Sequence, residues 1–188
     1  MEKKKTKFYL SLSFVAVATL ALLAVPLLAM QFTDDVNWRV SDFIMMGSLI
    51  FCTGSLLVVA LRLGAHIAYR AGMIMAIGAS FLMIWVNLAV GLISSGPNAG
   101  NLMYGGVTVI LIAGIYLSKF KPAGIERAMF ATAFSVLLVG VIALLMNMQN
   151  LPESSTLQII GVSLFFTLPY IVAGLLFRFV DQSQAATN

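Results

Sequence analysis

The chain has 188 residues, of which 61% are hydrophobic and 10% are charged, and its formal net charge is +4 at pH 7. Soluble domains hold roughly 45–50% apolar and about 25% charged residues, so a soluble fold of this size could not bury so much apolar surface. The basic residues stand in short clusters between apolar runs, which membrane topology explains, and this excludes a nucleic-acid-binding class. The composition therefore predicts an integral membrane protein.

Six apolar segments are long enough, or nearly so, to cross a bilayer as helices. A hydrocarbon core about 30 Å thick needs around 20 residues at about 1.5 Å rise each. No segment shows the alternation of a lipid-facing strand, and helices satisfy their own backbone in lipid. We therefore predict an all-α, polytopic fold, a single transmembrane domain over 1–188 whose helices lie at about 8–30, 43–61, 71–93, 102–118, 128–146 and 157–177.

The first apolar segment follows a basic start, as the core of a signal peptide would. Its apolar stretch exceeds the roughly 7–15 residues that are usual there, and no clear A-x-A cleavage site follows it. We expect a retained membrane anchor.

The stretch FTDDVNWRVSDF, residues 32–43, gathers acidic side chains around Arg39 and Trp38. On a short helix Asp35 would stand four residues before Arg39, the favourable order for an ion pair, and Trp38 suits a membrane interface. Two residues are candidates to cap the second helix, Ser41 and Asp42. An interfacial turn is the main interpretation. The alternative is a cation site formed by three carboxylates, Asp34, Asp35 and Asp42.

Asn87 lies inside the third apolar segment, about six residues and hence roughly 9 Å from its outer end. An asparagine in lipid usually hydrogen-bonds to a neighbouring helix, which is the main interpretation here. SSGPNAGN at 94–101 predicts a loop, because Gly and Pro break helices and Asn tolerates turns. The alternative is that the polar residues on this side form one outer-face network that receives a small polar ligand or a partner's loop. Its members would be Asp35, Trp38, Arg39, Asp42, Asn87, Asn101 and Tyr104.

The distribution of basic residues predicts the orientation. If the N-terminus is cytoplasmic, Arg39 alone falls outside, and the other Lys and Arg residues fall inside: Lys3, Lys4, Lys5, Lys7, Arg62, Arg70, Lys119, Lys121, Arg127 and Arg178. The positive-inside rule then places both termini in the cytoplasm. A weak repeat, YRAGM at 69–73 and ERAMF at 126–130, indicates either a duplication or the shared needs of two cytoplasmic helix ends.

Residues that catalysis or coupled transport would need are scarce. His66 is the only histidine and falls in an expected cytoplasmic loop, which excludes a bis-His haem or zinc site within the bundle. Cys52 is the only cysteine and cannot form an internal disulfide. No HExxH, GxSxG or Gly-rich phosphate motif occurs, and no carboxylate falls in the middle of a segment. We therefore expect no catalytic, cofactor-binding or metal-binding residues and no enzymatic activity.

Six motifs, taken in order, resemble the landmarks of a widespread group of small, uncharacterised bacterial inner-membrane proteins: MQFTDDVNW, DFIMMG, AYRAG, WVNLAVG, NLMYGGV and RAMFATA. The similarity spans about residues 29–135. SSGPNAGN stands where the group would have a longer, more acidic turn. Because the group has no assigned activity, the resemblance implies only the bacterial inner membrane and a multi-pass topology.

Three classes of function follow, in order of preference. The first is a structural or interaction protein, for example an accessory subunit that binds a membrane-protein partner or a second copy of itself within the lipid bilayer. The second is a small oligomeric channel or uncoupled transporter for a small polar solute. This class needs an aligned polar stripe, whereas the polar residues are scattered: Thr53, Ser80, Asn87, Thr108, Thr132, Ser135 and Thr167. The third, a membrane enzyme, lacks a base beside the aspartates at 34, 35 and 42.

Overall fold

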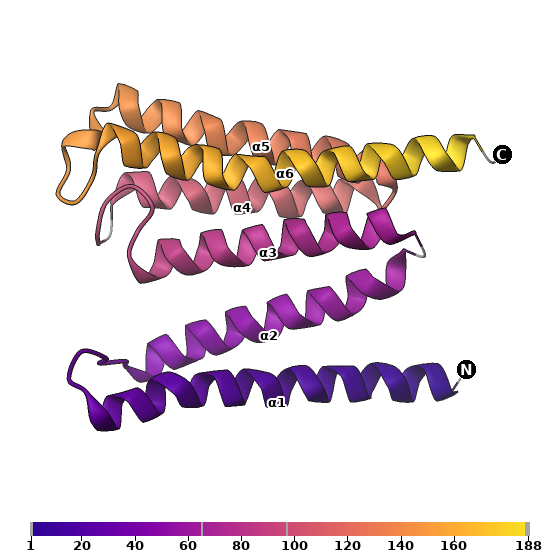
Figure 1. The fold of residues 1–188 in the computed structure, drawn as a ribbon, viewed down its shortest axis with the longest axis horizontal. Helices are drawn as coiled ribbons and strands as arrows, with labels where there is room; N and C mark the ends of the chain where they lie inside the picture. Colours follow the sequence, from indigo (N-terminus) through magenta and orange to yellow (C-terminus); the bar gives the residue numbers. More distant parts are fainter. Residues whose placement is uncertain (1, 65, 97, 187–188) are drawn as a thin grey trace. The chain divides into compact units, whose positions relative to one another are not determined.

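The computed structural model describes residues 2–64, 66–96 and 98–186, with side chains from residue 6 on. Lys3, Lys4 and Lys5 of the basic start therefore lie outside the described side chains. The described chain forms the helices α1 (Glu2–Phe32), α2 (Val40–Leu63), α3 (Ile67–Ala89), α4 (Ala99–Ser118), α5 (Pro122–Leu145) and α6 (Thr156–Ala185), and the 3-10 turn η1 (Met148–Asn150) (Figure 1).

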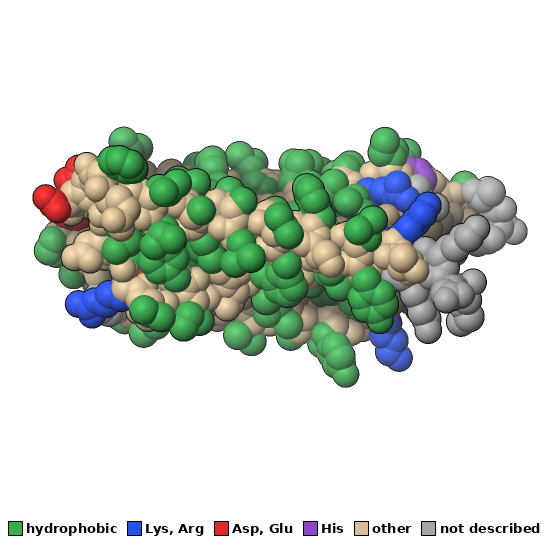
Figure 2. Space-filling view, turned by 90° about the horizontal axis from the view of Figure 1, so that it is seen from below, with side chains coloured by type: hydrophobic (Ala, Val, Ile, Leu, Met, Phe, Trp, Pro, Cys, Tyr) green, Lys and Arg blue, Asp and Glu red, His purple; other side chains and the backbone are tan. Residues whose placement is uncertain are grey.

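All six α-helices of the described chain are long and apolar enough to cross a membrane. This confirms the prediction of an all-α, multi-pass membrane protein. On the face drawn in Figure 2, hydrophobic side chains cover the middle, and the charged side chains stand near the two ends. Such a distribution keeps charges out of the hydrocarbon layer, where they would be costly.

The chain packs as two units, of which the first ends at Leu63 and the second begins at Gly64. The first unit is the α1–α2 hairpin. Glycines on α2 allow α1 to approach closely, since a Cβ added at Gly54 would stand 2.6 Å from Val15 Cγ1. Small residues at such crossings let membrane helices pack on each other. Even so, only two of the described side chains in this unit are buried, Thr19 and Ala60.

Arg62 joins the far ends of the hairpin. Its Nη2 donates to the backbone oxygen of Lys7 and to Ser11 Oγ, both at 3.0 Å. Its guanidinium carbon also lies 4.9 Å from the centre of the Phe8 ring. The three contacts hold the last turn of α2 against α1.

The second unit is a four-helix bundle, α3–α6. α5 packs extensively on both α4 and α6, and α6 also packs on α3, whereas α3 and α4 contact each other only slightly. The core lies mainly along α5 and α6, and its largest fully buried side chains include Tyr170, Phe177, Ile125, Met129 and Met83. The bundle is therefore closed on three sides and loosely closed at the α3–α4 seam.

Two polar contacts tie α6 to its neighbours. The hydroxyls of Ser80 on α3 and Tyr170 on α6 lie 2.9 Å apart. At the end of the bundle where α5 begins, Arg178 Nε donates to Glu126 Oε1 at 2.7 Å, and the guanidinium carbon of Arg178 lies 5.4 Å from the centre of the Phe130 ring. A polar bond in the core and an ion pair at the end thus fix how α6 lies in the bundle.

Helix ends differ from the apolar segments for identifiable reasons. α6 continues to Ala185, past the apolar run that ends near 177, since charged and amide side chains extend a helix readily beyond the membrane. α3 begins at Ile67, where His66 Nδ1 accepts from Ala68 N at 3.1 Å. It ends at Ala89, four residues before the apolar run does. The sequence does not continue as a helix there because Gly91 takes a positive φ of 80° and turns the chain.

Candidate functional site between α3 and α4

The loop between α3 and α4 is built around the side chain of Asn101. Asn101 Oδ1 accepts from the backbone nitrogens of Leu92 and Ile93, both at 3.0 Å. Its Nδ2 donates to the backbone oxygens of Ser94 at 2.7 Å and Gly96 at 3.1 Å. These four bonds use the full capacity of a side-chain amide. Asn101 is 7% exposed, and its side chain is fully engaged in holding the loop.

Asn98 and Ser94 complete the loop. Asn98 Oδ1 accepts from Asn101 N at 2.9 Å and so caps the N-terminus of α4. Ser94 Oγ donates to the backbone oxygen of Pro152 at 2.8 Å, which ties this loop to the connection between α5 and α6. Leu92 and Ile93, at 1% and 0% exposure, are buried by this fold of the chain.

Asn87 links the two helices, as the main interpretation of the sequence expects. Its Nδ2 donates to the backbone oxygen of Asn101 at 3.0 Å. Its Oδ1 is buried and has no hydrogen-bond partner among the described residues. Because α3 ends at Ala89, Asn87 lies in the last turn of the helix and not six residues inside it.

Tyr104 carries a second unsatisfied polar atom. The side chain is 2% exposed, and its hydroxyl, although near the Ser163 side chain, completes no hydrogen bond of acceptable geometry among the described residues. Ser163 Oγ donates its own hydrogen bond to the backbone oxygen of Ile159, at 2.7 Å. Tyr104 therefore places a buried hydroxyl beside Asn87 with its hydrogen-bonding capacity largely unused.

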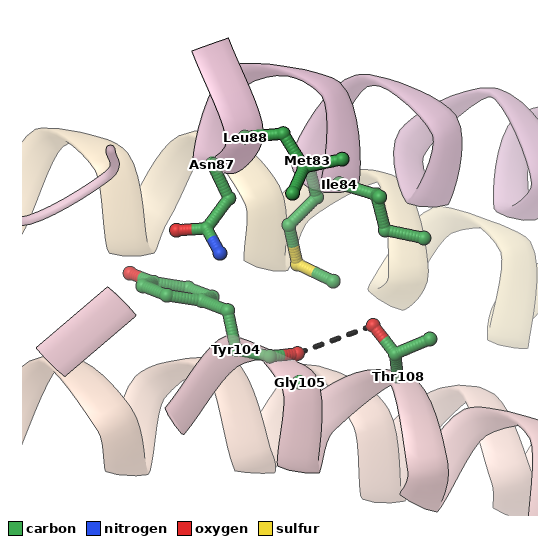
Figure 3. A pocket seen from close by; sticks show the side chains of 7 residues that line it. All are labelled: Met83, Ile84, Asn87, Leu88, Tyr104, Gly105 and Thr108. Atoms are coloured by element: carbon green, nitrogen blue, oxygen red, sulfur yellow. Dashed lines mark hydrogen bonds between the residues drawn. The ribbon is translucent and has the colours of Figure 1, made fainter. Parts of the chain in front are cut away.

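Both unsatisfied atoms belong to residues that line one hollow of about 280 Å³ at the α3–α4 seam. Figure 3 shows Asn87 and Met83 extending from α3 toward α4, with the Tyr104 ring facing the Asn87 amide. The rest of the lining is mostly apolar: Met83, Ile84, Leu88, Gly105 and Thr108. Thr108 Oγ1 donates to the backbone oxygen of Tyr104 at 3.1 Å, so this hydroxyl is already in use.

A second hollow, of about 370 Å³, adjoins the first, since both are lined by Asn87 and Leu88. It extends along the loop past Gly91 and Gly96 to Asn98 and Asn101. None of the residues described as lining either hollow carries a charge. The seam thus has an apolar hollow between the helices and an amide-rich, uncharged hollow at the loop.

The other sequence-predicted site residues belong to the first unit. Asp42 Oδ2 accepts from Arg39 N at 2.7 Å and so caps the start of α2, and the Trp38 ring packs on Phe43 with 5.2 Å between centres. Residues 33–39 form a turn at 34–35 and otherwise have no regular secondary structure, so they are not a short helix. Asp35 and Arg39 form no ion pair within the described chain, and Asp35 N donates to Thr33 Oγ1 at 2.8 Å.

The predicted outer-face network is therefore joined only in part. Asn87 and Asn101 are bonded and Tyr104 faces Asn87 (Figure 3), whereas the members from 35 to 42 belong to the other unit, so the single network stays a prediction. Over the described residues no group of three His, Cys, Asp or Glu side chains stands close enough to hold a metal ion. Sequence reasoning missed the hollow itself, although the pair Gly105–Gly106 signals a flat place on α4.

Comparisons with protein-family models, with curated proteins and with solved structures give no match for this chain.

Proposed function

We propose that this chain is a multi-pass protein of the bacterial inner membrane, with both termini in the cytoplasm, that acts through contact with another membrane protein as an accessory or structural subunit. The orientation rests on the charge distribution, in which Arg39 alone among the Lys and Arg residues falls outside. The assignment to the bacterial inner membrane rests on the resemblance of the six sequence motifs.

The observation that carries the proposal is how the spanning helices use their hydroxyl groups. Most of the hydrogen-bonded ones donate to a backbone oxygen four residues earlier in their own helix, and they include Thr19, Ser80, Thr108, Thr132, Ser135 and Ser163. A hydroxyl bonded in this way needs no water. A conducting path would need free polar groups aligned along one face, so this use of the hydroxyls favours a protein that works by packing over one that conducts.

The α1–α2 hairpin supplies the surface for such packing. Its described helices bury little more than Thr19 and Ala60, and large side chains of α1 such as Phe14 and Leu20 are 74% and 69% exposed. In lipid, helices associate through close packing of side chains and not through exclusion from water. We therefore assign the contact with a partner to α1.

Photo-crosslinking in cells tests this assignment. Benzoyl-phenylalanine would replace Phe14 or Leu20 on α1, and the matched controls would be Phe134 and Val141 on α5, which are 66% and 52% exposed. We expect one discrete protein adduct from the α1 positions and lipid adducts alone from the α5 positions. Lipid adducts alone from α1 would contradict the proposal, and an adduct with a second copy would identify a homo-oligomer.

A flux assay distinguishes the subunit proposal from the alternative, a small channel or uncoupled transporter. Purified protein in liposomes should not accelerate the exit of trapped small polar solutes such as glycerol. An acceleration that depends on the protein would overturn the subunit proposal in favour of a channel or uncoupled transporter.

A further inference from the structure

We propose that the α3–α4 seam binds a neutral amphiphile from the membrane, a molecule with a hydrocarbon chain and a head group that carries O–H or N–H donors. This inference does not rest on the proposed function, since it concerns only the four-helix unit.

Two buried polar atoms at the seam lack a hydrogen-bond partner among the described residues. Asn87 Oδ1 can only accept a hydrogen bond, and the Tyr104 hydroxyl can donate or accept one. Neither has a partner among the described residues, although both are buried. In native proteins most buried polar atoms form a hydrogen bond, and a buried polar atom without one destabilises the fold. A head group that donates to Asn87 and pairs with Tyr104 would satisfy both atoms at once.

The lining defines the rest of the molecule. Below Asn87 the hollow is walled by Met83, Ile84, Leu88 and Gly105 on two spanning helices, so what fills it there must be apolar. Beyond Asn87 the second hollow continues toward Asn98 and Asn101, with no charged side chain in its described lining. The head group would lie at Asn87, where the two hollows meet and Tyr104 is adjacent, and the hydrocarbon chain would run from there along the apolar part of the first hollow. The volumes, about 280 and 370 Å³, would hold the head group and the first carbons of its chain, and the rest of the chain would extend out of the hollow along the helices.

The seam is open because of its sequence. A Cβ added at Gly105 would meet no atom within 4 Å, so the glycine leaves space beside Tyr104 that no other side chain fills. α4 packs mainly on α5, and α3 mainly on α6. The two helices therefore contact each other only slightly within the bundle, and the space between them is left unfilled.

Direct binding to purified full-length protein tests the ligand class. The probes are 1-monooleoylglycerol, which has two hydroxyl donors, methyl oleate, which has none, and oleate, which is charged. Native mass spectrometry would give the stoichiometry, and titration would give the affinity. We expect one 1-monooleoylglycerol per chain, and about tenfold or more weaker binding of methyl oleate, as the loss of one or two buried hydrogen bonds implies. Oleate should bind more weakly still. Equal affinity for methyl oleate, preference for oleate or no binding at all would each overturn the proposal.

A matched pair of variants tests the place. Gly105→Leu fills the first hollow. Gly106→Leu adds the same side chain one residue away, where a Cβ also meets nothing within 4 Å, but Gly106 lines neither of the two hollows. We expect Gly105→Leu to abolish binding of 1-monooleoylglycerol and Gly106→Leu to retain it. Equal binding by both variants would place the ligand elsewhere.

Tyr104→Phe keeps the test independent of filling the hollow. Because the hydroxyl has no partner in the ligand-free chain, its removal should leave the melting temperature without ligand unchanged. Binding of 1-monooleoylglycerol should weaken about five- to tenfold. A clear fall in the ligand-free melting temperature, or unchanged binding, would show that the hydroxyl serves the fold and would contradict its role in the site.

Discussion

The side-chain nitrogen of Asn87 donates to the backbone oxygen of Asn101 at 3.0 Å, and this bond bridges α3 and α4, which otherwise contact each other only slightly. The side chain of Asn101 is meanwhile engaged in four bonds to the loop that joins the same helices. One residue thus offers its backbone to α3 and its side chain to the loop. The seam is held at its loop end by asparagines and left open within the helices.

Asn101→Ala should be the most damaging of the loop substitutions. It leaves two buried nitrogens, those of Leu92 and Ile93, without their acceptor. It also removes the two bonds from Asn101 Nδ2 to the backbone oxygens of Ser94 and Gly96, which keep only the longer bonds from Asn98 Nδ2. We expect a loss of about 2–4 kcal/mol in the free energy of unfolding. Asn98→Ala removes the cap of α4 and two bonds to oxygens that Asn101 also serves, and should cost less, about 1 kcal/mol. Thermal unfolding in detergent measures both losses, and equal losses would contradict the central role of the Asn101 side chain in the loop.

Gly91→Ala should be more costly than Gly96→Ala, although both glycines have positive φ, 80° and 76°. Each alanine would pay about 1–2 kcal/mol for the left-handed backbone. At Gly91 the new Cβ would also collide with the backbone oxygen of Ser94 and crowd Asn101 Nδ2, whereas at Gly96 it meets nothing within 4 Å. The difference between the two unfolding free energies isolates this contact. If the two variants are equally stable, the close packing of Asn101 on Gly91 is contradicted.

The sequence predicts the helices because their signal is length and apolarity, which each segment carries by itself. The bond from Asn87 to the next helix is also predictable, since a lone amide in lipid has few other partners. The end of α3 is not predictable in this way. Leu92 and Ile93 prolong the apolar run, and only the positive φ of Gly91 and the distant side chain of Asn101 turn them into a buried loop.

The hollow was unpredictable for a different reason. Its walls are Met83, Ile84 and Leu88, ordinary residues of a spanning helix, and the space arises because α3 and α4 each pack on another partner. Such a choice of neighbours depends on the whole bundle. The burial of Tyr104 was likewise unpredictable, since the sequence places it only in the predicted outer-face network, whereas the fold leaves it 2% exposed.

The bond between Ser80 and Tyr170 should show measurable coupling in the bundle core. Their hydroxyls lie 2.9 Å apart, and Tyr170 is fully buried. Interhelical hydrogen bonds in membrane proteins contribute about 0.6 kcal/mol on average and up to about 1.7 kcal/mol. A double-mutant cycle of Ser80→Ala and Tyr170→Phe should therefore give a coupling energy of about 0.5–1.5 kcal/mol. Strictly additive effects on the unfolding free energy would show that the two hydroxyls do not interact.

The ion pair between Glu126 and Arg178 should contribute little and in a salt-dependent way. The two atoms lie 2.7 Å apart, but the Arg178 side chain is 52% exposed, so water and ions reach it. We expect Glu126→Gln to lower the free energy of unfolding by about 0.5 kcal/mol at low ionic strength. At about 1 M salt the Debye length falls to about 3 Å, and the difference between variant and parent should become smaller.

The control is Arg178→Lys, which keeps the charge and loses the planar contact with Phe130, whose ring centre lies 5.4 Å from the guanidinium carbon. Unfolding measured for both variants at the two salt concentrations separates the terms, because screening affects Glu126→Gln and leaves the packing lost in Arg178→Lys unchanged. A loss in Glu126→Gln that is as large in high salt as in low salt would show that the carboxylate acts through its hydrogen bond and not through its charge.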